Sequence, residues 1–154
     1  MSDQLKLREA IPADAKSLLD FLKKASQQSD FIIFDDIKDV SVQAEADSLA
    51  EIFDSVTDEL IVAQLDEQII GFCRLEKVSA QEAEFGVVVD KEFWHNGIAT
   101  YLLEDALDWA AESELQTIIL EVYKDNSVAI HLYQKFGFTI ESETEKTYQM
   151  KKMV

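Results

Sequence analysis

A single glycine stands where a long amphipathic pattern begins, in the segment FWHNGIATYLLEDALDW of residues 93–109. Asn96 is a good N-cap residue, which makes Gly97 the expected first position of a helix. The backbone amides of residues 97–100 then lack intrahelical partners, and the helix dipole adds partial positive charge there. Because glycine has no β-carbon, an anion can approach this backbone closely. The segment therefore predicts a phosphate site, and an ordinary loop-to-helix turn is the alternative that the residues leave open.

Other side chains that could do chemistry are sparse. The residues after Gly97 lack the further glycines of a dinucleotide motif, and no Gly-Lys-Ser/Thr is present, so a phosphate site here is of another kind. Cys73 is the only cysteine, and His95 and His131 are the only histidines. These three residues stand at no metal-ligand spacing, so no metal site is expected. Cys73 is expected in the core, because neither histidine is close to it in sequence.

Composition narrows the class of protein. The 154 residues are expected to form a single domain, 1–154, and the one cysteine excludes an internal disulfide. The N-terminus shows no signal peptide and no stretch is long enough to span a membrane, so a cytoplasmic location is expected. The net charge of −17 repels nucleic acids and anionic membranes and favours cationic partners. A merely acidic surface is the alternative.

The hydrophobic period changes along the chain and predicts the elements that position these residues. A strand at 4–10 precedes two helices, one opening at Pro12 and one over 41–56. From residue 59 a hairpin with LDEQ at its turn and a strand AEFGVVVD follow. A helix over 97–113, a buried strand over 116–123, a helix from Asn126 to Gly137 and one or two closing strands complete the order. This order indicates an α/β fold, a mixed sheet with helices on both faces.

Two segments resemble the acyl-CoA-binding segments of the GNAT superfamily of N-acetyltransferases. The family loop Arg/Gln-x-x-Gly-x-Gly/Ala corresponds to Trp94-His95-Asn96-Gly97-Ile98-Ala99, in which Trp94 replaces Arg or Gln. The segment VYKDNSVAIHLYQKFGF matches the family's strand, Asn, Ala, Leu-Tyr and Gly-Phe in order. The resemblance covers the whole chain and implies the GNAT-like acyl-CoA N-acyltransferase fold. That fold has a mostly antiparallel, twisted central sheet of about seven strands, with about four helices on both faces.

The resemblance implies that acetyl-CoA is the co-substrate and that its pyrophosphate rests on backbone amides of the loop. Trp94 removes a side-chain donor from the loop edge, and a tryptophan there is expected to pack the loop against the sheet. The residues expected to contact the cofactor are Val87, Val88, Val89, His95, Asn96, Gly97, Ile98, Ala99, Thr100, Asn126, Ala129 and Tyr133.

The helix after Asn126 carries the general acid that the resemblance implies. Asn126, Ala129 or Ile130, and Tyr133 share one helix face because they fall at i, i+3 or i+4, and i+7. Ala129 would let the pantetheine arm come close, and Tyr133 would protonate the departing thiolate, which a phenol pKa of about 10 permits. A half-buried tyrosine that only packs is the alternative.

The reaction implied is direct attack by an amine on an acyl thioester in a ternary complex. A proton acceptor is needed, because a lysine-like amine is mostly protonated at neutral pH. Glu82 and Glu84 lie on one face of the strand before the loop. Glu84 is the expected base, with a solvated carboxylate as the alternative. A bulge at Gly86 is expected to turn an amide near Val87 or Val88 toward the thioester oxygen.

The acceptor site is expected to include the loop SDFIIFDDIKD, because in the family the region between the first two helices walls that site. Phe31 and Phe34 would contact an apolar part of the acceptor, and Asp35 and Asp36 would attract its cation. Two core phenylalanines with solvated acids are the alternative. The expected substrate-binding residues are Phe31, Phe34, Asp35 and Glu84.

The expected function is acetyl transfer to a primary amine of a small molecule, a polyamine or a peptide, with a cationic acceptor favoured by the charge. The resemblance also allows a homodimer, since dimers are common among similar proteins. Two alternatives remain: a catalytically silent acyl-CoA-binding sensor or interaction protein of the same fold, and an acidic interaction protein that uses the fold alone. Retention of Tyr133, Asn126 and the loop glycine favours the active enzyme.

Overall fold

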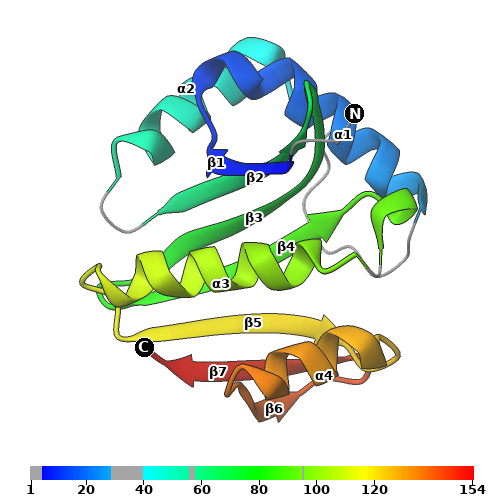
Figure 1. Cartoon of the computed structure of the whole chain (residues 1–154). Helices are drawn as coiled ribbons and strands as arrows, with labels where there is room; N and C mark the ends of the chain where they lie inside the picture. Colours follow the sequence, from blue (N-terminus) through cyan, green and yellow to red (C-terminus); the bar gives the residue numbers. More distant parts are fainter. Residues whose placement is uncertain (1–4, 29–39, 56–57, 95) are drawn as a thin grey trace.

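One twisted sheet forms the centre of the molecule in the computed structural model, which describes residues 5–28, 40–55, 58–94 and 96–154. Seven strands pair in the order β1-β2-β3-β4-β5-β7-β6 (Figure 1). The strands are β1 (Leu5–Glu9), β2 (Glu59–Leu65), β3 (Gln68–Ser79), β4 (Glu82–Val89), β5 (Thr117–Tyr123), β6 (Thr139–Glu143) and β7 (Thr147–Met153). The α-helices of the described residues are α1 (Ala15–Gln28), α2 (Val42–Phe53), α3 (Ile98–Ala111) and α4 (Ser127–Lys135).

The β4–β5 pair differs from every other pair in the sheet. All other neighbouring strands are antiparallel, whereas β4 and β5 are parallel. Their pairing covers only Glu82 to Glu84 against Thr117 to Ile119. Beyond Glu84 the two strands are no longer paired, and Figure 1 shows β4 and β5 diverging toward their carboxyl ends. The sheet therefore opens in its middle, at the carboxyl end of β4.

The two faces of the sheet carry separate cores because strand side chains alternate. On one face α1 and α2 pack on β2 and β3, with the Phe21 and Phe72 rings 6.0 Å apart in an edge-on contact. On the other face α3 and α4 cover β3, β4, β5 and β7, with Leu102 and Leu103 of α3 fully buried. Burial of each such leucine stabilises the fold by about 1.5–3 kcal/mol. Helices on both faces confirm the predicted architecture.

The expected element order is confirmed, with local differences at the ends. The pattern expected to open one helix at Pro12 forms a 3₁₀ turn, Pro12–Asp14, before α1. Asp14 stabilises this turn by accepting the Ile11 amide at 2.8 Å and both guanidinium ends of Arg8 at 2.8 and 2.9 Å. The closing segment forms two strands, β6 and β7. The predicted hairpin turn falls at Asp66, whose φ of 55° lies in the left-handed region.

Candidate active site

The loop after β4 is held by hydrogen bonds within its first turn, to α1 and to the end of β4. Asp90, fully buried at 1% exposure, caps the 3₁₀ turn Lys91–Phe93 by accepting the Glu92 amide at 3.0 Å. Its other carboxylate oxygen accepts the Lys24 ammonium of α1 at 2.8 Å. The Trp94 indole N–H donates to the Val89 carbonyl at 2.8 Å. Trp94 thus binds the loop to the end of β4, as its expected packing role requires.

Gly97 is needed for the backbone conformation that starts α3. The expectation that Asn96 is the N-cap and Gly97 the first helical residue is wrong: Gly97 itself is the N-cap, with φ 80°, and the helix begins at Ile98. Glycine adopts this left-handed conformation without strain, while for other residues it costs about 1 kcal/mol or more. Because the conformation alone accounts for the glycine, its presence is not by itself evidence of a ligand.

The amides at the start of α3 are the stronger indication of an anion site. In the described part of the chain, no hydrogen bond is made by the amides of Ile98, Ala99 and Thr100, and the first helical bond runs from the Tyr101 amide to the Gly97 carbonyl at 3.0 Å. These amides and the helix dipole offer aligned donors to a phosphate. Lys124, which precedes the Asn126 cap in the sequence, already forms an ion pair with Glu143 at 2.7 Å. The residues present therefore fit the pyrophosphate of an acyl-CoA through backbone donors.

Asn126 is the N-cap of α4, as predicted. Its side-chain oxygen accepts the Ala129 amide at 3.3 Å, and Ala129 is half-buried against the core that α3 covers. Seven positions after the cap, Tyr133 packs its ring edge-on against Phe85 of β4 and against Phe138, with centroids 6.2 and 5.8 Å away. The cap thus sets the start of the helix that presents Tyr133 to β4.

Tyr133 keeps its hydroxyl available to a ligand. The residue is only 7% exposed, and no described residue hydrogen-bonds to its phenol oxygen. Among the described residues no fully enclosed side-chain oxygen lacks a partner, so this oxygen reaches the molecular surface. Burial, with a smaller contribution from the nearby Cys73 thiol, raises the pKa of the phenol above its usual value. Tyr133 therefore holds its proton at neutral pH and can give it to a bound group, which is the capacity of a general acid.

The last residues of β4 face both cores. Val87 and Val89 contact the core under α3, while Val88 is buried on the α1 face. The bulge expected at Gly86 is wrong: β4 keeps a continuous register with β3 from Gly71–Val89 to Lys77–Ala83. The parting of β4 from β5 after Glu84, not a bulge, leaves this stretch beside an opening. A β-carbon added at Gly86 would meet no atom of the described residues within 4 Å.

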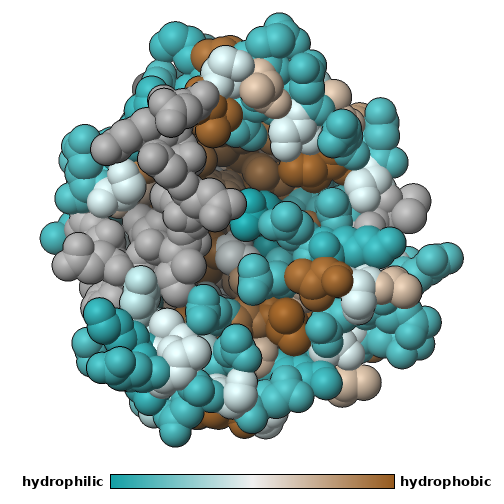
Figure 2. Space-filling model, turned by 180° about the vertical axis from the view of Figure 1, so that it is seen from behind, coloured by the Kyte–Doolittle hydropathy of each residue, from teal (hydrophilic) through white to brown (hydrophobic). Residues whose placement is uncertain are grey.

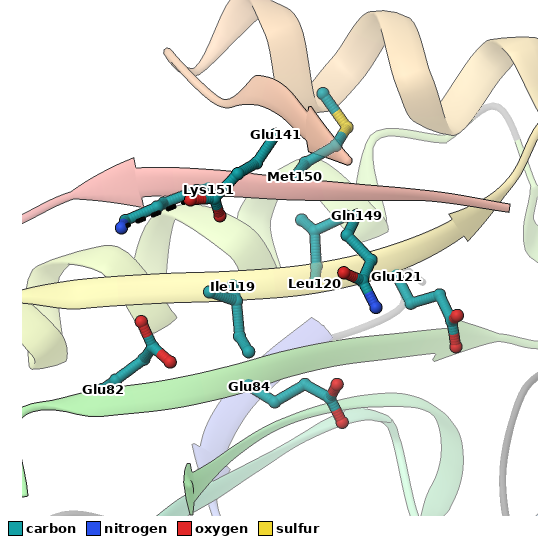
Figure 3. A pocket seen from close by; sticks show the side chains of 9 residues that line it. All are labelled: Glu82, Glu84, Ile119, Leu120, Glu121, Glu141, Gln149, Met150 and Lys151. Atoms are coloured by element: carbon teal, nitrogen blue, oxygen red, sulfur yellow. Dashed lines mark ion pairs between the residues drawn. The ribbon is translucent and has the colours of Figure 1, made fainter. Parts of the chain in front are cut away.

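An acid-lined cavity of about 330 Å³ lies on the sheet face opposite α3 and α4 (Figure 3). Strands β4, β5, β6 and β7 contribute its wall, and the lining residues are Glu82, Glu84, Ile119, Leu120, Glu121, Glu141, Gln149, Met150 and Lys151. In the view of Figure 3 the carboxylates of Glu84 and Glu121 lie at one end, away from the Glu141–Lys151 pair. Figure 2 looks onto the molecule from behind, and hydrophilic side chains cover most of the described surface there.

Charge in this cavity is strongly unbalanced. Lys151 is its one cation among the described residues and pairs with Glu141 at 3.6 Å. Glu121 accepts the Thr147 hydroxyl at 2.9 Å but, like Glu82 and Glu84, forms no ion pair within the described chain. Partial burial raises the pKa of Glu84, Arg74 opposes this, and Glu121 and Glu76 add to it. Glu84 is therefore a stronger base than a free carboxylate.

The predicted acid, Tyr133 of α4, and the predicted base, Glu84 of β4, lie on opposite sides of strand β4. Glu84 faces the cavity, while the next residue, Phe85, faces α4 and contacts Tyr133. Both sit where β4 leaves β5. A group that passes through this opening would meet Tyr133 from one side and Glu84 from the other.

Cys73 lies in the core, as predicted. It is 1% exposed, its thiol contacts the Leu102 carbonyl at 3.5 Å, and burial raises the pKa of the thiol. A nucleophilic cysteine needs a lowered pKa and access to substrate. Both properties are missing here.

Several predicted residues lie outside the described part of the chain: Phe31, Phe34, Asp35 and Asp36 of the acceptor loop, and His95 of the cofactor loop. Glu121, Glu141 and Gln149 were not predicted as site residues, because they come from strands far from Glu84 in sequence. Alternation in TIILEVY indicates only that Ile119 and Glu121 share a face. The Lys24–Asp90 ion pair was not predicted either, because no local sequence pattern indicates it.

Membrane-spanning helices and metal-ligand clusters are both absent from the described residues. None of the helices in these ranges combines the length and apolar character that a membrane crossing needs. In the same ranges no group of three or more His, Cys, Asp or Glu side chains is placed to hold a metal ion. The cytoplasmic location and the homodimer stay predictions.

Comparison with known proteins gives consistent results. Spermidine N(1)-acetyltransferase of Escherichia coli (strain K12) is 30% identical over 90 residues, which are 56% of this chain and 48% of the relative. The chain spans about half the length of the curated relatives it matches. An acetyltransferase of the GNAT family from Streptococcus pneumoniae has a TM-score of 0.91 at 29% identity, covering 98% of this chain and 100% of that one.

A more distant structure shows the same fold with a ligand. The PaiA N-acetyltransferase of Thermoplasma acidophilum, in complex with coenzyme A, has a TM-score of 0.83 at 21% identity, covering 98% of this chain and 99% of that one. The model of the acetyltransferase (GNAT) family matches residues 22–138, which include β4, the loop, α3, β5 and α4. By this match the chain belongs to the GNAT family of acetyltransferases.

Proposed function

We propose that this protein is an acetyl-CoA-dependent N-acetyltransferase whose acceptor is a cationic primary amine. Family membership supports the activity, and the observation that carries the choice of acceptor is the acid-lined cavity beside Glu84. A polyamine is the acceptor class in the name of one curated relative. Within the described residues three carboxylates of the cavity form no ion pair, and the full sequence has a net charge of −17. Both observations favour an ammonium group over a neutral or anionic one.

Cofactor binding is assigned to the start of α3 and its surroundings. The amides of Ile98, Ala99 and Thr100 would receive the pyrophosphate, and Gly97 keeps the turn before them free of a β-carbon. Ala129, at the start of α4, leaves room for the pantetheine arm, and the strand stretch Val87–Val89 lies beside the opening of the sheet. Bound acetyl-CoA supplies the acyl thioester.

The chain's own residues then move two protons. Glu84, directly or through water, takes a proton from the ammonium, and the freed amine attacks the thioester carbonyl. As the new C–N bond forms and the C–S bond breaks, the nitrogen releases its second proton to water, and Tyr133 gives its proton to the departing thiolate and regains one from water. An amide near Val87 or Val88 donates to the carbonyl oxygen. The products are an amide and the free thiol of CoA.

A thiol-release assay with acetyl-CoA tests the proposal with three acceptors: spermidine, butylamine and glutamate. We expect kcat/KM to fall roughly tenfold at each step in that order, because butylamine lacks the further ammonium groups of spermidine and glutamate adds carboxylates. The KM for spermidine should rise with salt, since screening weakens the attraction. The variant Glu121→Gln should weaken spermidine use, while the control Glu112→Gln, at the exposed end of α3, should not.

The same assay exposes the alternatives. Thiol release that is fastest with glutamate would show that the acid-lined cavity does not receive the acceptor. Absence of release with every amine, despite tight CoA binding, would instead indicate a silent acyl-CoA-binding protein.

A further inference from the structure

An ion pair connects α1 to the beginning of the cofactor loop. The Lys24 ammonium of α1 lies 2.8 Å from Oδ2 of Asp90, the first residue after β4. The Asp90 side chain is 1% exposed, whereas the Lys24 side chain is 45% exposed. Lys24 therefore reaches from the surface of α1 to a carboxylate that is buried in the protein.

Asp90 uses its carboxylate and its backbone to hold the turn before α3. Oδ1 accepts the Glu92 amide at 3.0 Å, and the Asp90 carbonyl accepts the Phe93 amide at 2.8 Å. The Asp90 amide donates to the Ile70 carbonyl of β3 at 2.8 Å. Only residues 94–96 separate this turn from Gly97. The direction of the turn therefore constrains the direction in which the first α3 amides point.

Lys24 lies on a helix that packs against the sheet. Phe21, three positions earlier in α1, packs edge-on against Phe72 of β3, and Ala25, the next residue, is buried in the same core. The hydrogen bond to Asp90 raises the pKa of Lys24, so its ammonium stays charged at neutral pH. Removal of this cation would take one charged partner away from a buried carboxylate, which is unfavourable.

We propose that Lys24 is a positioning residue for the cofactor: its ion pair with Asp90 ties α1 to the turn Lys91–Phe93 and so orients the first α3 amides for the CoA pyrophosphate. This inference rests on the proposed function, because it assumes that acyl-CoA binds at those amides. Lys24 does not touch the reacting atoms. Its loss is therefore a loss of cofactor affinity, with the chemical step preserved once cofactor saturates.

The variant Lys24→Met keeps an unbranched side chain of nearly the same length and removes its charge. We expect its KM for acetyl-CoA to rise about tenfold, as for a small displacement of binding groups, with kcat at saturating acetyl-CoA and the KM for the amine within about twofold of the wild type. CoA affinity by calorimetry should fall in parallel. Lys24→Arg should restore both values. Lys16→Met removes an exposed lysine of the same helix that pairs with Asp20, and should change neither.

The double variant Lys24→Met/Asp90→Asn separates orientation from stability. The introduced asparagine can still cap the turn, and the buried negative charge is removed together with the lysine, so this protein should fold even where the single variant does not. A KM for acetyl-CoA that stays raised in the double variant supports the tie to α1. A return to the wild-type KM would overturn it and leave the pair a stability role only.

The wild type distinguishes this inference from the function on which it rests. Unaltered CoA affinity in Lys24→Met, beside a wild type that binds CoA, overturns the positioning role alone. Failure of the wild type itself to bind CoA would overturn the cofactor site and this inference with it.

Discussion

The two sides of β4 are built in different ways. On the α3 side the candidate cofactor site consists of backbone amides at one helix start, closed by bonds between residues near in sequence, such as Trp94 to Val89. On the opposite side the candidate acceptor site consists of side chains from β4, β5, β6 and β7. One side offers hydrogen-bond donors and the other offers carboxylates.

This difference would let so acidic a chain bind an anionic cofactor. Backbone amides and the helix dipole give positive potential without any cationic side chain. The strand carboxylates can then select a cation on the other face. Substitutions of side chains should therefore alter acceptor use more readily than cofactor use, except where they change backbone conformation.

The largest effect is expected at the junction of the two sides. We predict that Tyr133→Phe lowers kcat about 10²–10³-fold, because the thiolate loses its proton donor, while CoA affinity changes less than about threefold. Steady-state rates and calorimetry measure the two quantities. Phe85 and Phe138 still pack on the new ring, so folding should persist. A kcat equal to that of the wild type would remove Tyr133 from the mechanism.

The next effect belongs to the acceptor side. The rate should rise as pH passes through the pKa of Glu84, because only the ionised carboxylate accepts a proton, and burial places that rise above the range of a free carboxyl. Glu84→Gln should lower kcat about 10–10²-fold and abolish this rise. The pH profile of kcat is the measurement, with Glu112→Gln as the control. Retention of the rise in Glu84→Gln would assign it to another group.

A matched pair of glycine substitutions should separate the two sides. Gly97→Ala forces a β-carbon into the left-handed region, which costs about 1 kcal/mol or more, so the KM for acetyl-CoA should rise roughly fivefold. The β-carbon of Gly86→Ala meets no atom of the described part of the chain within 4 Å, and this variant should alter the KM for the amine alone. Initial rates with each substrate varied in turn give both values. If both variants changed the KM of the same substrate equally, the cofactor and acceptor sites would not lie on separate sides of β4.

The smallest effect is expected at Trp94. Trp94→Phe keeps an aromatic ring and removes the indole N–H that binds the Val89 carbonyl, a bond worth about 0.5–1.5 kcal/mol. The KM for acetyl-CoA should rise about two- to fivefold with the amine KM unchanged, as rates at varied acetyl-CoA will show. An unchanged cofactor KM would mean that the loop does not depend on this bond.

Local chemistry made the cofactor side readable from sequence. The glycine at a helix start and the Asn126 cap are short-range signals, and the helices they predict are present. The helical position predicted for Gly97 and the bulge predicted at Gly86 were wrong for physical reasons. Pattern alone does not reveal a left-handed N-cap, and strands that part can open a sheet as well as a bulge can.

The acceptor side and the Lys24–Asp90 ion pair could not be predicted from the sequence, because both depend on long-range pairing. Glu84 meets Glu121 and Gln149 only because β5 lies beside β4 in the sheet and β7 lies beside β5. Lys24 and Asp90 are 66 positions apart and belong to different elements. Single-sequence periodicity assigns a face to each of these residues but not a partner.

The most direct test of the account is a matrix of initial rates at varied acetyl-CoA and spermidine, with the product identified by mass spectrometry. Two separate sites and direct transfer predict a mono-acetylated amine and double-reciprocal lines that intersect, since both substrates must be bound together. Parallel lines, which indicate an acetylated enzyme formed before the amine binds, would contradict it.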